Sequence, residues 1–577
     1  MFARRPAGMR VIEQATDAVT KWRLLNERRL LWERSGRQPP LIRVWDKQLQ
    51  YMGTLLGQMQ SGEWERLWDD TGVGTIRVTW SDWLAQAIKE TRYQEDLHLS
   101  IDPNRSIRSW RTRLGYRIQA VKAMKLEDGT KCVELELMSL REHAKHIALI
   151  PTPVSAPEFQ PLKSWIWVQN AASNLAFTTF LNLARNFWPL LSVPTSLFDP
   201  TYWLTTRVGN VSPLHWPIQV QFINPVFDQS RIVPLASKAQ MLHDIHAPIG
   251  EDTGVGLIDY LWLTEDKDSP HPELAALVGE KLARPSRNCV VLAFENKSGV
   301  TGPTGTAVDG AINAVGALLD DTITEVILPL DADGDGITDP LFRRLLGVAP
   351  ERPSLVWRDC RHSGIITSTH RMQRATARTV WTGGHSPTWL NQLITFVIRY
   401  ALAQLEQVIN YGTGAYQQPG TSGLDNVYQG QLDDIFFAWQ KWTNLKVALL
   451  MNDYALCDHV ENGSGYAYVV SSFLTLRQGL FKTQPKVSFT MTTRDAHPHV
   501  YGFDYVVGER GLWEIDGIYY QDQIRGGKWS VDDTKPLSLD LTIGKQRDAD
   551  PVEGAMKALS DGWNAIGSLV GGAAVAA

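Results

Sequence analysis

An acidic stretch at positions 330–340, LDADGDGITDP, contains the residues of this chain best suited to chemistry. Its carboxylates recur at alternate positions and Gly336 permits a sharp turn, which is the D-x-D-x-D-G pattern of a calcium-binding loop. An EF-hand in its usual form is excluded, because Phe342 stands where that motif needs a bidentate Glu. The candidate calcium ligands are the side chains of Asp331, Asp333, Asp335 and Asp339 and the carbonyl oxygen of Ile337.

Two interpretations of this stretch stay open. In the first, calcium binds the loop and stiffens it. In the second, the stretch is an acidic turn whose aspartates cap the next helix. The role is structural in both cases, so the sequence predicts no required cofactor and one possible structural Ca²⁺.

The other patterns that could support catalysis are weak. The sequence has no G-x-x-x-x-G-K-[ST] phosphate loop and no H-E-x-x-H zinc motif. Two histidine pairs, His143 with His146 and His243 with His246, have no third ligand near them in the sequence, so we predict that neither binds a metal. Acidic residues number 62, so the mere presence of paired carboxylates indicates no glycosidase. We predict no catalytic residues and no enzyme activity.

The stretch GHSPT at 384–388 is similar to the G-x-S-x-G nucleophile elbow. Thr388 replaces the last glycine, however, and we expect no clear strand before it. Ser386 followed by Pro387 is the preferred order for the start of a helix. The sequence therefore predicts a helix cap at Ser386.

The four cysteines, Cys132, Cys289, Cys360 and Cys457, lie far apart and form no C-x-x-C pair. This spacing argues against a zinc site and against a disulfide framework, and it favours synthesis in a reducing cytoplasm. The N-terminal residues lack the apolar core of a signal peptide. No stretch reaches the ~18 apolar residues of a membrane span, so we predict none.

Charge is unevenly distributed along the chain, whose net charge of -5 favours no specific nucleic-acid partner. Residues 1–37 carry a net charge of +5, and residues 251–340 carry -12. These two regions could meet across an interface, or each could be a solvated face. The 22 tryptophans fit either several aromatic cores or interfaces.

Hydrophobic periodicity predicts β-rich regions near both ends of the chain. Residues 41–57 fit a strand, a turn and a second strand, and residues 131–140 alternate apolar side chains with Glu134 and Glu136. Two more alternating segments, KVSFTMT and LSLDLTI, place strands within 485–545. NCVVLAFEN is the clearest strand between these regions.

Helices are predicted mainly elsewhere. Residues 9–36 carry an apolar stripe at helical spacing, and residues 162–190 fit one or two buried helices. Two long helices follow, one starting at Ser386 and one over residues 431–451. The second would place Leu432, Ile435, Trp439 and Trp442 on one face.

The C-terminal segment carries a separate pattern, in which apolar residues are spaced alternately four and three apart. This is a heptad seam of under three heptads, so the helix it predicts must dock on its own chain, on symmetry copies or on a partner. The predicted assembly interface consists of Val552, Met556, Leu559, Trp563, Ile566 and Val570.

These elements predict a multidomain α+β fold, with β domains near both ends bracketing a helical middle. The expected divisions are 1–37 for an N-terminal amphipathic helix, 38–155 for a first β domain, 156–240 for a helical and linker region, 241–380 for a mixed acidic domain with the Asp-rich loop, 381–480 for a helical domain, 481–548 for a second β domain and 549–577 for a C-terminal amphipathic helix.

Several stretches together resemble one family. They run from RVWDKQLQYMGTLLG and DGTKCVELELMSLREHAKHIALIP through VTGPTGTAVDG, LLGVAPERPSLVWRD and GGHSPTWLNQ to LDDIFFAWQKW, GSGYAYVVSSFLTLRQGLF and VYGFDYVVGERGLWEIDGIYYQDQI. Their order over residues 40–545 resembles the long minor tail proteins, or tail-tip hubs, of siphoviruses that infect actinobacteria, in particular mycobacteriophages.

The resemblance implies a homotrimer at the tail tip of the virion, synthesised in the host cytoplasm. Each chain would pack two β-barrel-like hub domains side by side, with helical and mixed peripheral domains between them in sequence. The trimer would join the sixfold tail tube to the central tip. The implied partners are the distal tail protein, the tape-measure protein and other minor tail proteins, and the implied roles are tail assembly, host attachment and genome delivery.

Two functions from other classes are alternatives. The chain could be a hydrolase that degrades the host envelope, for which one carboxylate substitution would abolish activity on cell walls. It could also be a tail protein that binds a host receptor or glycan through exposed tryptophans. We expect the structural role, and we place the C-terminal helix against its symmetry copies or the tape-measure C-terminus on the tail axis.

Overall fold

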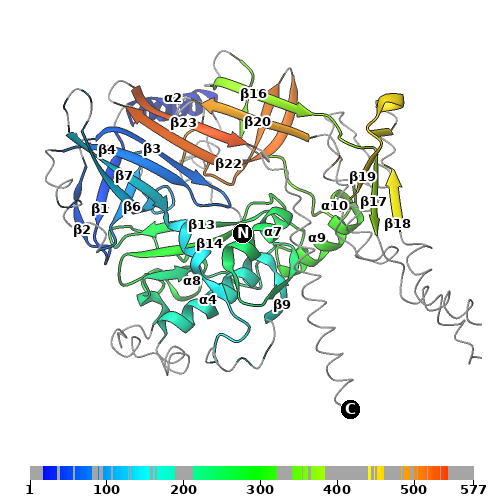
Figure 1. The fold of residues 1–577 in the computed structure, drawn as a ribbon, viewed down its shortest axis with the longest axis horizontal. Coiled ribbons are helices and arrows are strands. Elements are labelled where there is room, and N and C mark those ends of the chain that lie inside the picture. Colours follow the sequence, from blue (N-terminus) through cyan, green and yellow to red (C-terminus); the bar gives the residue numbers. More distant parts are fainter. Residues whose placement is uncertain are drawn as a thin grey trace, which may run out of the picture.

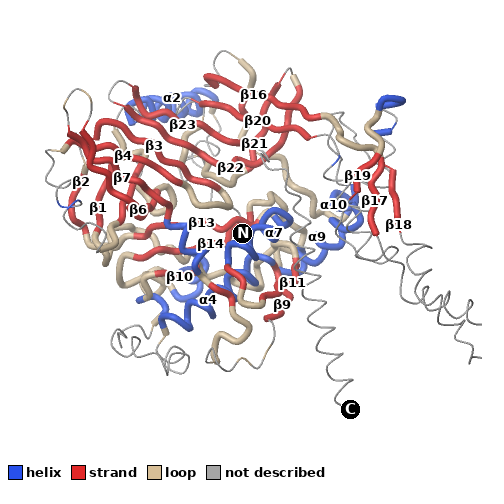
Figure 2. The backbone as a smooth tube through the Cα atoms, viewed as in Figure 1, coloured by secondary structure: helices blue, strands red, loops and turns tan. Residues whose placement is uncertain are grey.

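A computed structural model describes residues 17–35, 39–55, 59–80, 95–155, 160–188, 212–320, 341–383, 439–460 and 486–543, with short gaps inside several of these ranges. Mixed α and β structure is confirmed, and strands are more numerous than helices in this described part. Figures 1 and 2 show many of the strands gathered in one large sheet, with most helices on one side of it, and β17, β18 and β19 apart at the right.

The large sheet has 13 strands and brings the two predicted β regions together. The strand order is β16-β20-β23-β22-β3-β4-β7-β6-β5-β1-β2, with β21 also paired to β22 and β15 paired to β21. The strands are β1 Leu41–Trp45, β2 Tyr51–Thr54, β3 Met59–Leu67, β4 Val73–Thr79, β5 His98–Asp102, β6 Leu114–Lys125, β7 Lys131–Ser139, β15 Val356–Trp357, β16 Ile365–Gln373, β20 Lys486–Thr493, β21 Arg510–Ile515, β22 Ile518–Asp532 and β23 Lys535–Ile543.

The predicted pair of barrel-like domains is not confirmed. Among the described residues no sheet closes on itself, and β3 pairs antiparallel with β22, with Trp64 opposite Trp529. Both indoles are fully buried, and they belong to one hydrophobic core. The two β regions are therefore halves of one continuous sheet, because the apolar faces on either side of the β3–β22 pair fuse into a shared core.

A second, smaller sheet lies against the large one. It consists of β10 Ile218–Val220, β14 Cys289–Asn296 and β13 Val255–Trp262. All residues of β13 are buried, because both of its faces are covered. Ile258, Tyr260 and Trp262 join the core of the large sheet, whereas Val255 and Leu257 pack with two helices on the other face.

Those helices are α4 Ala171–Phe187 and α7 Leu242–Thr253, so the central body has three layers: large sheet, small sheet and helices. Smaller elements complete the described fold: α2 Ala18–Ser35, η1 Leu140–His146, β8 Ala148–Leu149, β9 Trp165–Asn170, η2 Pro213–His215, β11 Ile232–Ser237, β12 Gln240–Met241, α8 Pro272–Val278, α9 Ala307–Leu319, α10 Leu341–Leu345, β17 Thr379–Gly383, β18 Trp439–Thr443, η4 Asn452–Tyr454 and β19 Asp458–Val460.

Many predicted elements are confirmed. The strands expected at 131–140, at NCVVLAFEN and at LSLDLTI are β7, β14 and β23. In β7, Val133, Leu135 and Leu137 are buried and Glu134 and Glu136 are partly exposed, as the alternation predicts. The N-terminal helix is confirmed over α2, where Trp22 is 67% exposed.

Several predictions were wrong. Residues 165–170, expected to be helical, form β9, because the aromatic and β-branched run WIWV pairs with β11. Trp439 and Trp442, expected on one helix face, lie in β18, which pairs antiparallel with β17. β17 is also a strand directly before GHSPT, where none was expected. The middle of the chain is mixed rather than helical, since it contains the small sheet.

Candidate functional site

The residues predicted from the sequence to bind calcium or to form the assembly interface lie outside the described residues. These are Asp331, Asp333, Asp335, Ile337 and Asp339, and Val552, Met556, Leu559, Trp563, Ile566 and Val570. The helix after the acidic stretch, α10, takes a cap from Asp320, which precedes that stretch. The Asp320 carboxylate accepts hydrogen bonds from the backbone N–H groups of Phe342 at 2.6 Å and Arg343 at 3.0 Å.

The two histidine pairs lie on short elements beside the small sheet. His143 and His146 belong to η1, and His243 and His246 belong to α7. Burial lowers the pKa of His246 to about 3 and that of His143 to about 4, so both are neutral at pH 7. In the described part of the chain, no group of three or more His, Cys, Asp or Glu is arranged to hold a metal ion.

A cluster of five charged side chains, four of them buried, lies between the large and small sheets; we call it the Arg113 cluster. Arg113 precedes β6 and donates to Asp266, in the loop after β13, with Nη1–Oδ2 2.7 Å and Nη2–Oδ1 3.0 Å. Its Nε lies 3.3 Å from Oδ1 of Asp102, whose Oδ2 lies 3.1 Å from Nη2 of Arg43. The cluster consists of Arg43, Asp102, Arg113, Glu265 and Asp266.

The charges of this cluster pair with one another and so hold the two sheets together. Burial raises the pKa of Asp102 above its ordinary value, although Arg113 and Arg43 both oppose that shift. Arg113 is 1% exposed and gives a further hydrogen bond to the backbone carbonyl of Leu261. Such a network fixes the two sheets relative to each other, because each charge is costly to bury without its partners.

A second charged group, partly buried, joins the small sheet to the C-terminal half of the large sheet. Lys297 Nζ lies 3.2 Å from Glu295 and 3.1 Å from Glu509. Burial alone would lower the pKa of Lys297, but Glu295 and Glu509 raise it above its ordinary value. Tyr260 donates to Glu295 at 2.6 Å, so the carboxylate is held by both a cation and a hydroxyl.

Trp68 lies where the N-terminal half of the large sheet, the small sheet and the C-terminal half of the large sheet meet. This residue follows β3, is 1% exposed, and its ring lies directly against the Cα positions of Gly256 in β13 and Gly508 before β21. Gly508 also has a φ of +100°, which favours glycine. A side chain at either glycine would displace the indole, so the close packing of the three segments depends on both glycines.

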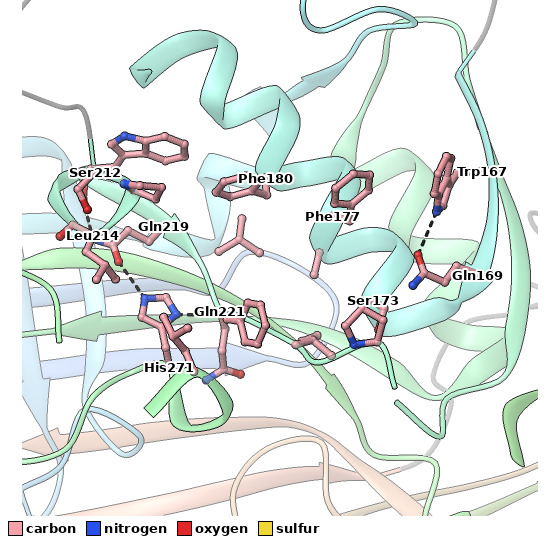
Figure 3. A pocket seen from close by; sticks show the side chains of 18 residues that line it. Trp167, Gln169, Ser173, Phe177, Phe180, Ser212, Leu214, Gln219, Gln221 and His271 are labelled. Carbon is pink, nitrogen blue, oxygen red and sulfur yellow. Dashed lines mark hydrogen bonds between the residues drawn. The ribbon is translucent and has the colours of Figure 1, made fainter. Parts of the chain in front are cut away.

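One large cavity opens on the helical layer, between α4 and β10. Its volume is about 650 Å³, within the range of small-molecule sites. Figure 3 shows the labelled lining residues spread along α4, with Leu214 and His271 near one end and Trp167 near the other. Aromatic rings dominate the wall: Phe180 stacks on Trp216 at a centroid distance of 5.4 Å, and Trp167 lies 5.8 Å from Phe177.

Sequence reasoning missed the Arg113 cluster, the Trp68 junction and this cavity. The first two join residues that are far apart in the sequence, and no local pattern marks them. The run WIWVQN was a signal for the third, because two exposed or half-exposed tryptophans on a short strand indicate a surface that faces something apolar.

Comparison with known proteins identifies relatives over nearly the whole chain. A family model described as Siphovirus ReqiPepy6 Gp37-like protein matches residues 41–545. Minor tail protein Gp28 of Mycobacterium phage D29 is 23% identical over 585 residues, which covers 94% of this chain and 96% of that protein. Minor tail protein Gp28 of Mycobacterium phage L5 matches with the same identity and coverage. These matches confirm the resemblance inferred from the sequence.

Two solved structures are more distantly similar. The tail protein from Neisseria meningitidis MC58 aligns with a TM-score of 0.37 and 8% identity, covering 88% of this chain and 97% of that one. The 43 kDa tail protein of prophage MuSo2 from Shewanella oneidensis aligns with a TM-score of 0.37 and 8% identity. The alignment covers 88% of this chain and 100% of that protein. Similarity this low carries no statement about the present chain.

Proposed function

Because the chain belongs to the family of Siphovirus ReqiPepy6 Gp37-like proteins, we propose that it is a structural minor tail protein of a long-tailed phage virion. The observation that carries this proposal is the match to the minor tail proteins of phages D29 and L5 across 94% of the chain and 96% of each relative. Because the match extends over nearly all of both proteins, it supports the same overall architecture for this chain. A match limited to one shared domain would support much less.

The internal geometry supports a scaffold without enzymatic activity. The Arg113 cluster and the Lys297 group use their charges against one another across the layers. Trp68 packs against glycines from two distant segments. These contacts resist relative movement of the layers, which suits a protein that transmits load within an assembly. In the part of the chain that the structure describes, no helix is long and apolar enough to cross a membrane.

In the finer form of the proposal, three copies form a hub at the tail tip, joining the tail tube and distal tail protein to the central tip. Such a hub needs the two β regions of each chain close together, and the β3–β22 pairing, which joins them in one sheet, supports this part of the proposal. The predicted C-terminal helix, with its stripe from Val552 to Val570, meets its symmetry copies or the end of the tape-measure protein. In this proposal the acidic stretch at 331–339 has a structural role, either as a loop that calcium stiffens or as an acidic turn that caps the next helix.

Electron cryomicroscopy of intact tails tests the proposal. We expect three copies of the chain around the tail axis, between the tube and the tip, in contact with the distal tail protein. A chain located on peripheral fibres would refute the hub but leave a tail role. A chain absent from purified particles would refute the structural role altogether.

A further inference from the structure

We propose that the cavity between α4 and β10 binds one unbranched alkyl chain of an amphiphile. This inference concerns a ligand site and is independent of the proposed place of the chain in the tail. It follows from the shape of the cavity, the chemistry of its wall and the way its polar groups are already used.

The mouth of the cavity is unusually apolar for a surface. Trp167, Phe177 and Phe222 line it and are 42%, 41% and 37% exposed, respectively. Val226 and Phe227, which follow the lining residue Pro225 in sequence, are 60% and 53% exposed. Exposed aromatic rings at a cavity mouth mark a place where a binding partner removes them from water.

The polar groups of the floor bond to one another and to the backbone. Gln219 Nε2 donates to the carbonyl oxygens of Leu214 and Trp216, and Gln219 Oε1 accepts from His271 Nε2 at 2.9 Å. The other ring nitrogen of His271 accepts from the backbone N–H of Phe222 at 3.2 Å. Gln221 Nε2 donates to the Pro270 carbonyl at 2.7 Å. These groups are therefore not directed at a ligand.

The floor is also uncharged at neutral pH. Burial lowers the pKa of His271 to about 4, so its imidazole is neutral, which agrees with one nitrogen donating and the other accepting. Ser173 lines the cavity, and its Oγ donates at 2.6 Å to Asp228, which is not a lining residue. A charged or strongly hydrogen-bonding ligand would find no complement among these residues.

These observations favour a hydrocarbon over a peptide. A peptide that entered the cavity would bury backbone N–H and C=O groups, and Gln219, His271 and the Nε2 of Gln221 on the floor are already engaged with the protein. An alkyl chain has no such groups and can lie along α4, with its polar head left at the open mouth beside Trp167. Flat aromatic walls fit a narrow methylene chain, because rings give large apolar contact area with few degrees of freedom.

The test uses the purified full-length chain and cis-parinaric acid, an alkyl probe that fluoresces when it leaves water. Ala176 lines the cavity from α4 and is 7% exposed, and Leu274 lines it from α8. Ala176→Phe and Leu274→Trp therefore fill the space from opposite walls. Ala123→Phe, on the exposed part of β6, is the matched control. Thermal melting establishes that each variant folds.

Saturable binding by the wild type and by Ala123→Phe, weakened by about tenfold or more in either cavity-filling variant, supports the proposal, since each ring takes the volume of several methylenes. Equal binding by all four proteins would mean adsorption to the surface and would overturn it, as would no saturable binding by the wild type. Displacement of the probe by dodecanol tests that the chain, and not the carboxylate, is recognised. Flotation with phosphatidylcholine vesicles then separates two sources of the alkyl chain. If the chain comes from a membrane lipid, the wild type should float with the vesicles and Ala176→Phe should not. If it comes from a free amphiphile, neither protein should float.

Discussion

Arg113 and Asp266 form a two-pronged ion pair across the large and small sheets, although 153 residues separate them in sequence. The guanidinium nitrogens lie 2.7 and 3.0 Å from the two carboxylate oxygens, and the side chains are 1% and 6% exposed. Paired hydrogen bonds in one plane fix orientation as well as distance. The pair therefore sets how the loop after β13 docks beside β6.

Removing one partner of this pair will be costly. In Arg113→Met, Asp102 and Asp266 stay buried without their main counter-charge, so we expect the free energy of unfolding to fall by about 3–5 kcal/mol. Urea denaturation of the purified chain, followed by tryptophan fluorescence, measures this. Arg117→Met, on β6 four residues after Arg113, is the control, because Arg117 pairs with Asp96 at 2.6 Å in an exposed position and should contribute at most about 1 kcal/mol. Equal losses in the two variants would contradict the role given to the buried cluster.

Gly508→Ala will destabilise the junction at Trp68. The added methyl group would overlap the indole ring of Trp68, and the alanine would have to adopt the positive φ of Gly508. Gly517 has a φ of +83° and nothing within 4 Å of its added Cβ, so Gly517→Ala carries the backbone penalty alone. We expect the first variant to lose about 1–3 kcal/mol more than the second, the usual range for overpacking. Thermal denaturation of both proteins provides the comparison, and similar melting temperatures would show that Trp68 can move.

Acid will destabilise the fold between pH 6.5 and about 4, partly through His246. Its pKa falls from 6.5 to about 3 on folding because the ring is buried, with Nε2 donating to the Val255 carbonyl at 3.0 Å. Across this window the unfolded chain binds a proton that the folded chain does not, so stability is lost as pH falls. The expected loss from this residue is on the order of 3 kcal/mol at pH 4.

His246→Gln removes that titration while keeping a donor for Val255. Its stability should therefore fall less steeply with pH than that of the wild type over the same window, as measured by urea midpoints at half-unit pH steps. His146→Gln, at a residue whose side chain is 74% exposed, is the control and should retain the wild-type slope. Parallel curves for wild type and His246→Gln would refute the assignment.

The sequence was informative where a pattern is local. In β7, Val133, Leu135 and Leu137 alternate with glutamates, and this period identifies a strand with one buried face without knowledge of its neighbours. In β18, Trp439 and Trp442 are three residues apart, which matches a helix equally well, and pairing with β17 decides the outcome. Local periodicity cannot distinguish these cases because the deciding contacts come from residues 379–383.

The contacts of Trp68 and Arg113 and the β3–β22 pairing could not be predicted from local sequence patterns, for the same reason. Nothing near Trp68 indicates that Gly256 and Gly508 will lie against its ring, and nothing near Arg113 indicates Asp266. The β3–β22 pairing joins segments at opposite ends of the chain, so two β regions that look separate in the sequence form one sheet. Contacts of this kind depend on the whole fold, which explains why a pair of barrels was a reasonable but unconfirmed expectation.

Calcium distinguishes the two interpretations of the acidic loop. If the loop binds Ca²⁺, adding the ion at about 100 times its dissociation constant should stabilise the wild type by roughly 2.7 kcal/mol, since only the folded loop presents all ligands. The double variant Asp331→Asn with Asp333→Asn should lose this response, and Mg²⁺ should not reproduce it because it demands smaller, octahedral geometry. A wild-type melting temperature that ignores Ca²⁺ would favour the acidic turn.

Deleting residues 551–577 should impair tail assembly while leaving the described body folded. The predicted helix is too short to be stable alone, so its apolar stripe must be buried by another surface in the particle. Leu559→Asp with Ile566→Asp places charges on the stripe and should reproduce the deletion, whereas Ser560→Asp with Ser568→Asp adds the same charges beside it and should be tolerated.

Plaque counts and negative-stain images of tails from phage carrying each allele measure the effects of the deletion and of both double variants. Normal, infectious particles from the deletion would show that the stripe is not an assembly interface, and equal failure of the two double variants would show that added charge, rather than position on the stripe, is responsible.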